Sequence, residues 1–215
     1  MHRVSRREIL RRAAAAGAAT AVSGRALAQL GGAREESSPE ALDEPLYRLL
    51  EAVVARLIPS DANGPGALEA GAARYIDRAL DDALVASLDA YTQGLAALDA
   101  HAREMHGRAF VDLVPEIQDA MLEQLERDGL DGFMPSAAAF FEMMLAHTLE
   151  GTFGDPYYGG NRDFIGWDLL GYPGIRLAVT AAEQRLEPPR EITRMSAYEI
   201  PMFESLDPAS ELDDG

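Results

Sequence analysis

The feature that most constrains this chain is a helical spacing of apolar residues that recurs from Leu46 to Leu149. Over residues 46–58 the apolar side chains fall at intervals of three and four, which places them along one stripe of a helix. Pro59 ends this stretch, because proline cannot continue the hydrogen-bond ladder of a helix. No segment shows the apolar–polar alternation of β-branched residues that predicts a strand. The expected fold class is therefore all-α.

The same spacing predicts further helices along the chain. They are expected over residues 67–82, over residues 84–105, from Pro115 at a first helical turn, and from Pro135-Ser136 through Leu149. A short helix is expected over residues 164–170, and residues 175–186 can form one more. Together these predict a compact bundle of about five to six helices with a Gly/Tyr-rich C-terminal loop region and an extended tail.

The composition divides the chain into four parts. Residues 1–28 have the order of a signal peptide, and residues 29–44 form a polar, flexible lead-in. Residues 45–186 form the helical domain. Residues 187–215 are acidic and contain proline, so that they are expected to be extended.

The N-terminal leader has the elements of a twin-arginine (Tat) signal. Arg6 and Arg7 precede an Ala-rich stretch over residues 13–22, and Ala26-Leu27-Ala28 is an A-x-A cleavage site. The apolar stretch has roughly half the length that a membrane-spanning helix needs. The leader therefore predicts folding before export, the Tat translocase as a transient partner, cleavage after Ala28, no membrane span after cleavage and a periplasmic destination. The alternative is a basic amphipathic helix at the start of a cytoplasmic protein.

Charge and cysteine content exclude several classes of protein. Asp and Glu number 36 against 19 basic residues, all of them Arg, and the net charge is −17. A nucleic-acid-binding protein needs a basic surface that displaces counterions from phosphates, so this class is excluded. The chain has no cysteine, which excludes disulfides, thiolate nucleophiles, Cys-ligated iron–sulfur clusters and covalent c-type haem.

The sequence offers no self-contained active site, so we expect no catalytic, cofactor-binding or metal-binding residue in this chain. His101 and His106 are five residues apart, so they do not share a helix face as the histidines of H-E-x-x-H do. His147, near Glu150, is interpreted as a polar residue at the flank of a helix. The acidic residues of the helices are interpreted as a solvated face: Asp77, Asp81, Asp82, Glu123 and Glu126.

Residues 151–174 differ from the rest of the chain. This segment holds seven Gly, two Pro, three Tyr and the only Trp, so it cannot be a long regular helix. Its aromatic side chains can anchor it either to the helices of its own chain or to another protein.

Short motifs along residues 45–174 carry a resemblance to a known family. They are Leu57-Ile58-Pro59-Ser60-Asp61, Gly64-Pro65-Gly66, Leu149-Glu150-Gly151, Asp155-Pro156 with Tyr158-Gly159-Gly160-Asn161-Arg162-Asp163, Gly166-Trp167, and Gly171-Tyr172-Pro173-Gly174. With these the chain resembles the small subunit (subunit 3, or gamma) of the gluconate 2-dehydrogenase family. It departs from the family at Asp168, where a Lys is expected, and in the tail beyond Ile175.

The resemblance implies a three-part periplasmic complex. A large FAD-containing subunit oxidises a sugar or polyol, and a cytochrome c subunit with haem c passes the electrons on. The small subunit is non-catalytic, carries no cofactor, stabilises the flavoprotein and brings it through the Tat pathway on its own signal.

Two functions are left open for the loop over residues 151–174. The favoured one is contact with the large subunit. The alternative is a stand-alone periplasmic sugar-binding protein or enzyme, in which Asp155, Asn161, Arg162 and Asp163 contact the sugar. The residues predicted to bind the partner are Asp155, Tyr157, Tyr158, Gly160, Asn161, Arg162, Trp167 and Tyr172.

Overall fold

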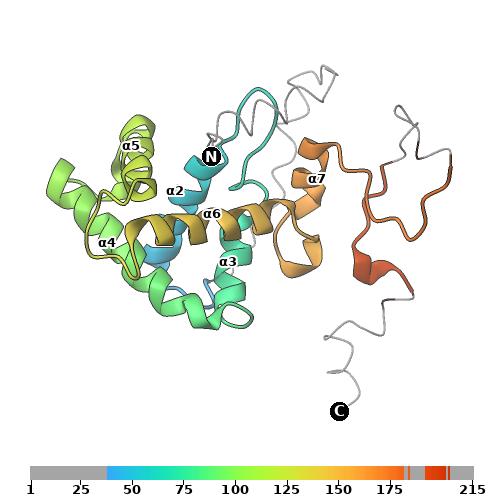
Figure 1. Cartoon of the computed structure of the whole chain (residues 1–215), viewed down its shortest axis with the longest axis horizontal. Helices are drawn as coiled ribbons and strands as arrows, with labels where there is room; N and C mark the ends of the chain where they lie inside the picture. The colour runs from blue at the N-terminus through green and yellow to red at the C-terminus, as the bar shows by residue number, and fades with distance from the viewer. Residues whose placement is uncertain (1–37, 182–183, 185–191, 202, 204–215) are drawn as a thin grey trace, which may run out of the picture. The chain divides into compact units, whose positions relative to one another are not determined.

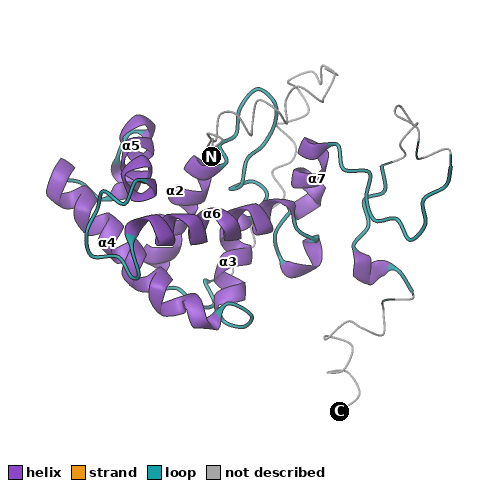
Figure 2. Ribbon diagram, in the orientation of Figure 1, coloured by secondary structure: helices purple, strands orange, loops and turns teal. Residues whose placement is uncertain are grey.

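The computed structural model of the chain describes residues 38–181, 184, 192–201 and 203. The Tat signal predicted at Arg6 and Arg7, its cleavage after Ala28 and most of the lead-in lie outside these residues. The described part contains six α-helices and no β-strand, so the all-α class is confirmed (Figure 2).

The α-helices follow one another with short connections. They are α2 (Glu44–Leu57), α3 (Ala72–Leu80), α4 (Leu88–His106), α5 (Pro115–Glu126), α6 (Ala137–Phe153) and α7 (Ile165–Leu170). Single turns of 3-10 helix lie between or beyond them: η1 (Val85–Ser87), η2 (Phe110–Asp112), η3 (Pro156–Tyr158), η4 (Arg162–Phe164) and η5 (Ala197–Glu199).

Helix α6 is the centre of the bundle, because it packs against α2, α3, α4, α5 and α7 (Figure 1). Its buried face contributes Phe140, Phe141 and Met144 to the core. Gly94 of α4 lies directly on the Phe140 ring, where a Cβ would come within 2.4 Å of a ring carbon. The absence of a side chain at Gly94 therefore allows α4 to approach α6 closely.

Side-chain caps explain where two of the helices begin. The Asp43 carboxylate accepts the Leu46 N–H at the start of α2. The Ser136 hydroxyl accepts the Ala139 N–H at the start of α6. Such caps replace the partners that the first N–H groups of a helix lack.

Two helix predictions are wrong. The helix expected over residues 67–82 is confined to α3, because Gly71 adopts a left-handed conformation (φ 78°) and the residues before it form turns. The helix expected over residues 175–186 is not formed at residues 175–181, where Leu177 and Val179 are exposed. No buried face is available to these two side chains, so nothing favours a helix there.

Asp77 overturns two further predictions. Its carboxylate is 0% exposed and accepts the N–H groups of Glu40, Ala41 and Leu42 at 2.7, 3.2 and 2.9 Å. Asp77 is thus a buried anchor, and its interpretation as part of a solvated face is wrong. The lead-in predicted over residues 29–44 also ends earlier, since residues 40–42 are fixed on α3. The other four acidic residues of that prediction are exposed: Asp81, Asp82, Glu123 and Glu126.

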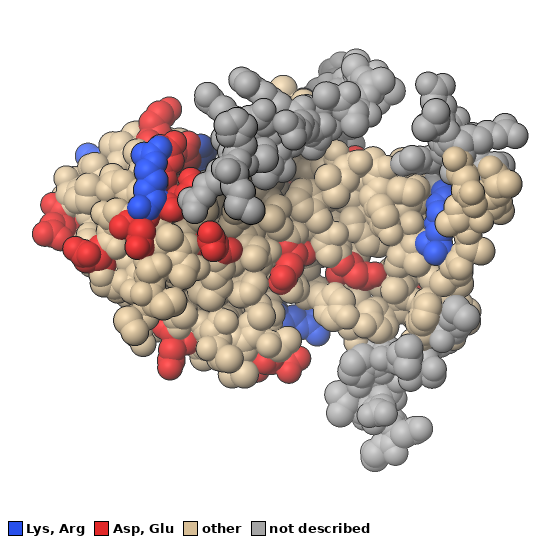
Figure 3. All heavy atoms as spheres, viewed as in Figure 1, with Lys and Arg blue, Asp and Glu red and all other residues tan. Residues whose placement is uncertain are grey.

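Acidic side chains outnumber basic ones on the face drawn in Figure 3, and many of them gather over α4 and α5. An ion pair between Arg56 of α2 and Asp119 of α5 (2.8 Å) joins two helices across this region. None of the described helices has the length and apolar character that crossing a bilayer requires.

Candidate functional site: the glycine- and tyrosine-rich loop

The segment predicted as a loop begins with the last turn of α6. The Thr148 hydroxyl donates to the Met144 carbonyl and the Thr152 hydroxyl to the Thr148 carbonyl, each at 2.7 Å. Both threonines are buried, and their hydroxyls find partners within the helix. Helix α6 continues to Phe153 and carries the start of the loop as part of a rigid element.

Asn161 joins the end of α6 to the start of α7. Its side chain is 0% exposed; Nδ2 donates to the Gly154 carbonyl and Oδ1 accepts the Gly166 N–H, both at 2.8 Å. Its own N–H donates to the Gly151 carbonyl at 2.7 Å. Asn161 has a left-handed backbone (φ 41°), which asparagine tolerates better than most residues. Asn161, which was predicted to contact a partner, is thus buried and engaged within its own loop in this conformation.

Two glycines let the loop backbone lie directly on α6. A Cβ at Gly160 would be 2.1 Å from the Gly151 carbonyl oxygen, and one at Gly166 would be 1.8 Å from the Thr152 carbonyl oxygen. Both distances lie far inside any allowed contact, so backbone packs on backbone without a side chain between. Gly160, which was predicted to contact a partner, thus supports the loop from inside.

Trp167 is the hydrophobic anchor of the loop. Its indole N–H donates to the Phe153 carbonyl at 2.9 Å, and its side chain is only 6% exposed. The ring packs on Phe164 and, edge to face, on Tyr172, with centroids 5.1 and 4.9 Å away. Such burial with a satisfied N–H is typical of a structural tryptophan. Trp167 therefore belongs to the interior of the loop, and only Tyr172 of this cluster reaches the surface.

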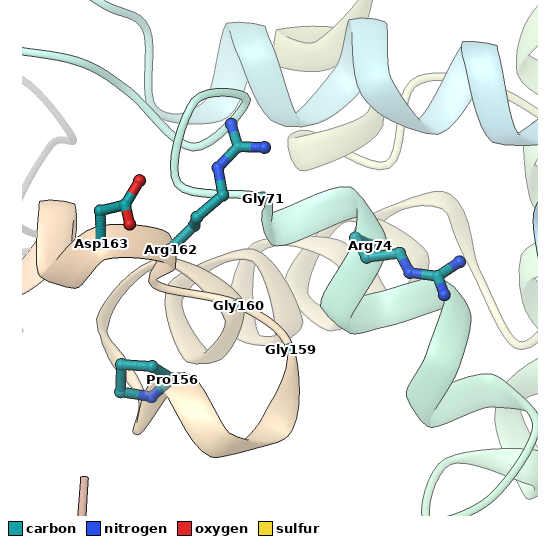
Figure 4. A pocket seen from close by; sticks show the side chains of 7 residues that line it. All are labelled: Gly71, Arg74, Pro156, Gly159, Gly160, Arg162 and Asp163. Atoms are coloured by element: carbon teal, nitrogen blue, oxygen red, sulfur yellow. The ribbon is translucent and has the colours of Figure 1, made fainter. Parts of the chain in front are cut away.

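Arg162 ties the loop to the turn before α3. Its backbone N–H donates to the Ala70 carbonyl at 2.9 Å, and its guanidinium donates to the Glu69 carbonyl at 2.8 Å. Beside it lies a hollow of about 290 Å³. The hollow is lined by Gly71, Arg74, Pro156, Gly159, Gly160, Arg162 and Asp163 (Figure 4).

The hollow offers little to a small ligand. Figure 4 shows the Arg74 side chain extending away from the loop residues that line it. The Arg162 guanidinium is directed toward the turn before α3, where it binds the Glu69 carbonyl. The volume of the hollow is at the lower limit of small-molecule sites. Such sites also place several polar groups around the ligand.

A pair of tyrosines forms the exposed end of the loop. Asp155 caps the turn η3 by accepting the Tyr157 N–H at 3.0 Å, and the Tyr157 and Tyr158 rings meet edge to face. Tyr198, from the tail, stacks on Tyr157 with centroids 4.0 Å apart. The Tyr158 and Tyr198 hydroxyls lie 2.7 Å apart, and this hydrogen bond, with a smaller contribution from burial, raises the pKa of Tyr158 to about 12.

The tail makes three more contacts with this region. Ala197 donates its N–H to Asp155 Oδ2 at 2.9 Å, and Thr193 donates to the Pro173 carbonyl at 3.0 Å. The Arg194 guanidinium donates to both oxygens of Asp168, each at 2.9 Å. The residues over which the loop was predicted to face a partner are thus partly covered by the same chain.

The eight residues predicted to bind a partner fall into three groups. Exposed are Tyr158, Arg162 and Tyr172; half-buried are Asp155 and Tyr157; buried are Gly160, Asn161 and Trp167. Sequence reasoning missed Arg194 and Ser196 as members of the same region. The only available signal was the recurrence of apolar and aromatic residues in the tail. This pattern indicates that the tail contacts a surface, but it does not say which surface.

His147 and the tyrosines near it form contacts within the bundle. The His147 ring stacks on Tyr91, and its Nδ1 lies 3.0 Å from the Tyr91 hydroxyl. Burial lowers the pKa of His147, and the charge of Glu150 opposes this shift. Tyr75 donates to Glu150 at 3.0 Å. Among the described residues no group of three or more His, Asp or Glu is placed to hold a metal ion.

Comparison with known proteins gives one match. Residues 45–174, more than half of the chain, match the family described as Gluconate 2-dehydrogenase subunit 3. The match ends at Gly174, so the tail that covers the tyrosines lies beyond it. No curated protein and no solved structure is significantly similar to the chain.

Proposed function

The chain belongs to the gluconate 2-dehydrogenase subunit 3 family, and on this premise we propose that it is the non-catalytic small subunit of a periplasmic FAD-dependent sugar or polyol dehydrogenase complex. Its task is to escort the large flavoprotein subunit through the Tat pathway and to stabilise it. The FAD belongs to that large subunit, and a cytochrome c subunit is the further partner.

The observation that carries the proposal is a folded-export signal on a chain without cofactor chemistry of its own. Arg6 and Arg7 with the A-x-A site at residues 26–28 form a Tat address, whereas no cofactor-binding motif occurs in the sequence. Tat export serves proteins that fold inside the cell. A small helical domain has a reason to use it if it takes a cofactor-loaded partner along.

The loop over residues 151–174 is the proposed contact with the large subunit. Its scaffold is fixed by Asn161, Gly160 and Trp167, and it presents Tyr158 and Tyr172 at 49% and 39% exposure. Exposed tyrosines on a rigid support are typical of interface anchors, because they bury much area and lose little conformational freedom.

The stand-alone sugar-binding alternative has less support. Asn161 uses both ends of its amide inside the loop, and the Arg162 guanidinium already donates to Glu69. Two of the four residues that were expected to contact a sugar are thus engaged elsewhere. Calorimetric titration of the purified chain with glucose and gluconate checks this directly, and we expect no heat of binding.

The escort role is tested by changing the leader. The double variant Arg6→Lys/Arg7→Lys, co-expressed with the large subunit, should leave both polypeptides in the cytoplasm, because the Tat translocase reads the twin arginine. Cell fractionation, immunoblotting and FAD fluorescence follow the two chains. The matched control is Arg11→Lys/Arg12→Lys in the same leader, which should export both. Arrival of the flavoprotein in the periplasm without the Arg6–Arg7 pair would contradict the proposal.

A further inference from the structure

The C-terminal strap, residues 192–200, covers a defined surface of the loop. This surface, the tyrosine face, consists of Asp155, Tyr157, Tyr158, Asp168 and Pro173. Hydrogen bonds and ring stacking join the strap to the tyrosine face. The Thr193 N–H donates to the Pro173 carbonyl, and the Arg194 guanidinium donates to Asp168. The Ala197 N–H donates to Asp155, and Tyr198 stacks on Tyr157. We propose that the strap occupies the tyrosine face in the unassembled subunit and is displaced when the large flavoprotein subunit docks there. This inference rests on the proposed function.

The tyrosine face and the strap lie in different parts of the chain. All five residues of the tyrosine face fall within residues 45–174, the part that matches the family, whereas the whole strap lies beyond it. A docking surface that serves a family-wide assembly must lie in the matched part, although Asp168 itself departs from the Lys that is expected there. The strap is then an addition that occupies this surface.

Release of the strap leaves polar and aromatic groups of the tyrosine face without the contacts that the strap supplies. Asp155 Oδ2 loses the Ala197 N–H, the Asp168 carboxylate loses three hydrogen bonds from the Arg194 guanidinium, and the Tyr157 ring loses its stacking contact with Tyr198. The uncovered face thus offers two acidic acceptors and an aromatic surface. It fits a partner segment that brings an arginine or N–H donors together with an aromatic ring, which is what the strap itself supplies.

The strap is held weakly enough to leave the tyrosine face. Its ion pair joins side chains that are 54% and 41% exposed, and exposed ion pairs contribute little. Only Ser196 and Ile200 of the strap are buried. No residue of the strap belongs to the hydrophobic core of the bundle. Release of the strap therefore leaves the core intact.

The strap can be opened in the full-length chain without touching the tyrosine face. The variant Arg194→Ala/Tyr198→Ala removes the ion pair and the stacking, and Ile192→Ala, an exposed position on the same segment, is the matched control. Amide hydrogen exchange is the first readout: the Thr193 and Ala197 amides should be protected in the wild type and in the control and should exchange rapidly in the double variant. Rapid exchange in the wild type would overturn the proposal, since the strap would then not hold the face.

Binding to the purified, FAD-loaded large subunit is the second readout, measured by biolayer interferometry. If the strap is closed about nine-tenths of the time, opening it should tighten the apparent Kd roughly tenfold, because only the open fraction binds. A synthetic peptide of residues 190–203 should compete with the flavoprotein for the double variant. The same peptide with Ala at positions 194 and 198 should not compete.

The outcomes separate this inference from the proposed function. Equal affinities of the wild type and the double variant would overturn the cover role, and so would weaker binding by the variant, which would make the strap part of the interface. No binding by either form would refute the proposed function, and the inference with it. If the double variant fails to fold, as circular dichroism would show, Ala197→Pro serves in its place, because proline removes the N–H that donates to Asp155.

Discussion

At the scale of single residues, the decisive positions are short polar side chains that are completely buried. Asp77 accepts hydrogen bonds from several backbone N–H groups. Asn161 donates to one backbone carbonyl and accepts from one backbone N–H. Buried polar groups are retained where they satisfy such groups. The sequence predicts both residues as exposed, since Asp and Asn are exposed in most positions and burial is decided by neighbours far away in the chain.

Asp77→Ala should destabilise the fold by about 3 kcal/mol, because three backbone N–H groups of residues 40–42 lose their acceptor together. Urea unfolding followed by circular dichroism measures the loss. Asp82→Ala, on the exposed end after α3, is the control and should change the free energy of unfolding by less than about 0.5 kcal/mol. Equal effects of the two changes would show that Asp77 is not an anchor.

Tyr75 should make the fold sensitive to alkali. Burial, with a second contribution from the hydrogen bond to Glu150, raises the pKa of Tyr75 from 10.0 to about 12. Below pH 10 both the folded and the unfolded chain hold the proton. Between pH 10 and about 12 only the unfolded chain releases it, so stability falls as the pH rises through this window.

The variant Tyr75→Phe tests this window. It should make the loss of stability between pH 10 and 12 less steep, and thermal unfolding at a series of pH values measures the slope. Tyr172→Phe, at an exposed tyrosine, is the control for the general effect of losing one hydroxyl. An unchanged slope in Tyr75→Phe would contradict the burial and the hydrogen bond described for Tyr75.

At the scale of elements, apolar spacing predicts which segments are helices but not where they end. α2, α4, α5 and α6 lie where the stripes predict them, since a stripe reports one buried face. Their ends depend on other information. α3 begins late because Gly71 is left-handed, and α6 continues through Gly151 because that glycine packs against Ala72 and Tyr75. Such contacts between distant segments leave no periodic mark in the sequence.

Composition locates the candidate site, but it does not assign a role to each residue within it. The density of Gly, Tyr and Trp over residues 151–174 correctly marks a special loop. It cannot tell scaffold from surface, because a tyrosine that anchors a loop and one that anchors a partner have the same chemistry. What distinguishes the buried Trp167 from the exposed Tyr172 is the hydrogen bond from the indole N–H to the Phe153 carbonyl.

Gly166→Ala should be far more damaging than Gly171→Ala. A Cβ at Gly166 would overlap the Thr152 carbonyl oxygen, so the loop must move off α6, with a loss of about 3 kcal/mol or more. Gly171 has open space around it, and its backbone is left-handed. Alanine there should therefore lower the free energy of unfolding by about 1 kcal/mol. Thermal unfolding compares the two, and Trp167 fluorescence should shift only in Gly166→Ala. Similar losses in both would argue against the backbone contact.

At the scale of the whole molecule, acidic residues strongly outnumber basic ones. The net charge is −17, and residues 1–28 contain six Arg and one Glu, so residues 29–215 are more acidic still. Like charges on one surface repel each other and weaken the compact state until salt screens them.

Raising NaCl from 10 mM to 0.5 M should therefore raise the melting temperature of a chain that consists of residues 29–215. A gain of about 1 kcal/mol corresponds to roughly 2–4 °C for a domain of this size. Differential scanning calorimetry measures the change, and KCl at the same concentrations should give the same result. A constant or falling melting temperature would mean that the acidic groups are arranged without net repulsion.

The contact between the loop backbone and the last turn of α6 has a consequence for how specificity can evolve. Where peptide groups rest on peptide groups, the shape of the platform is set by main-chain geometry, and the identity of the surrounding side chains has little influence on it. Outward-facing positions such as Tyr158 can then be exchanged to suit a different companion while their supporting frame stays in place. If the proposed function holds, one subunit architecture can in this way be matched to a new partner while its own fold stays the same.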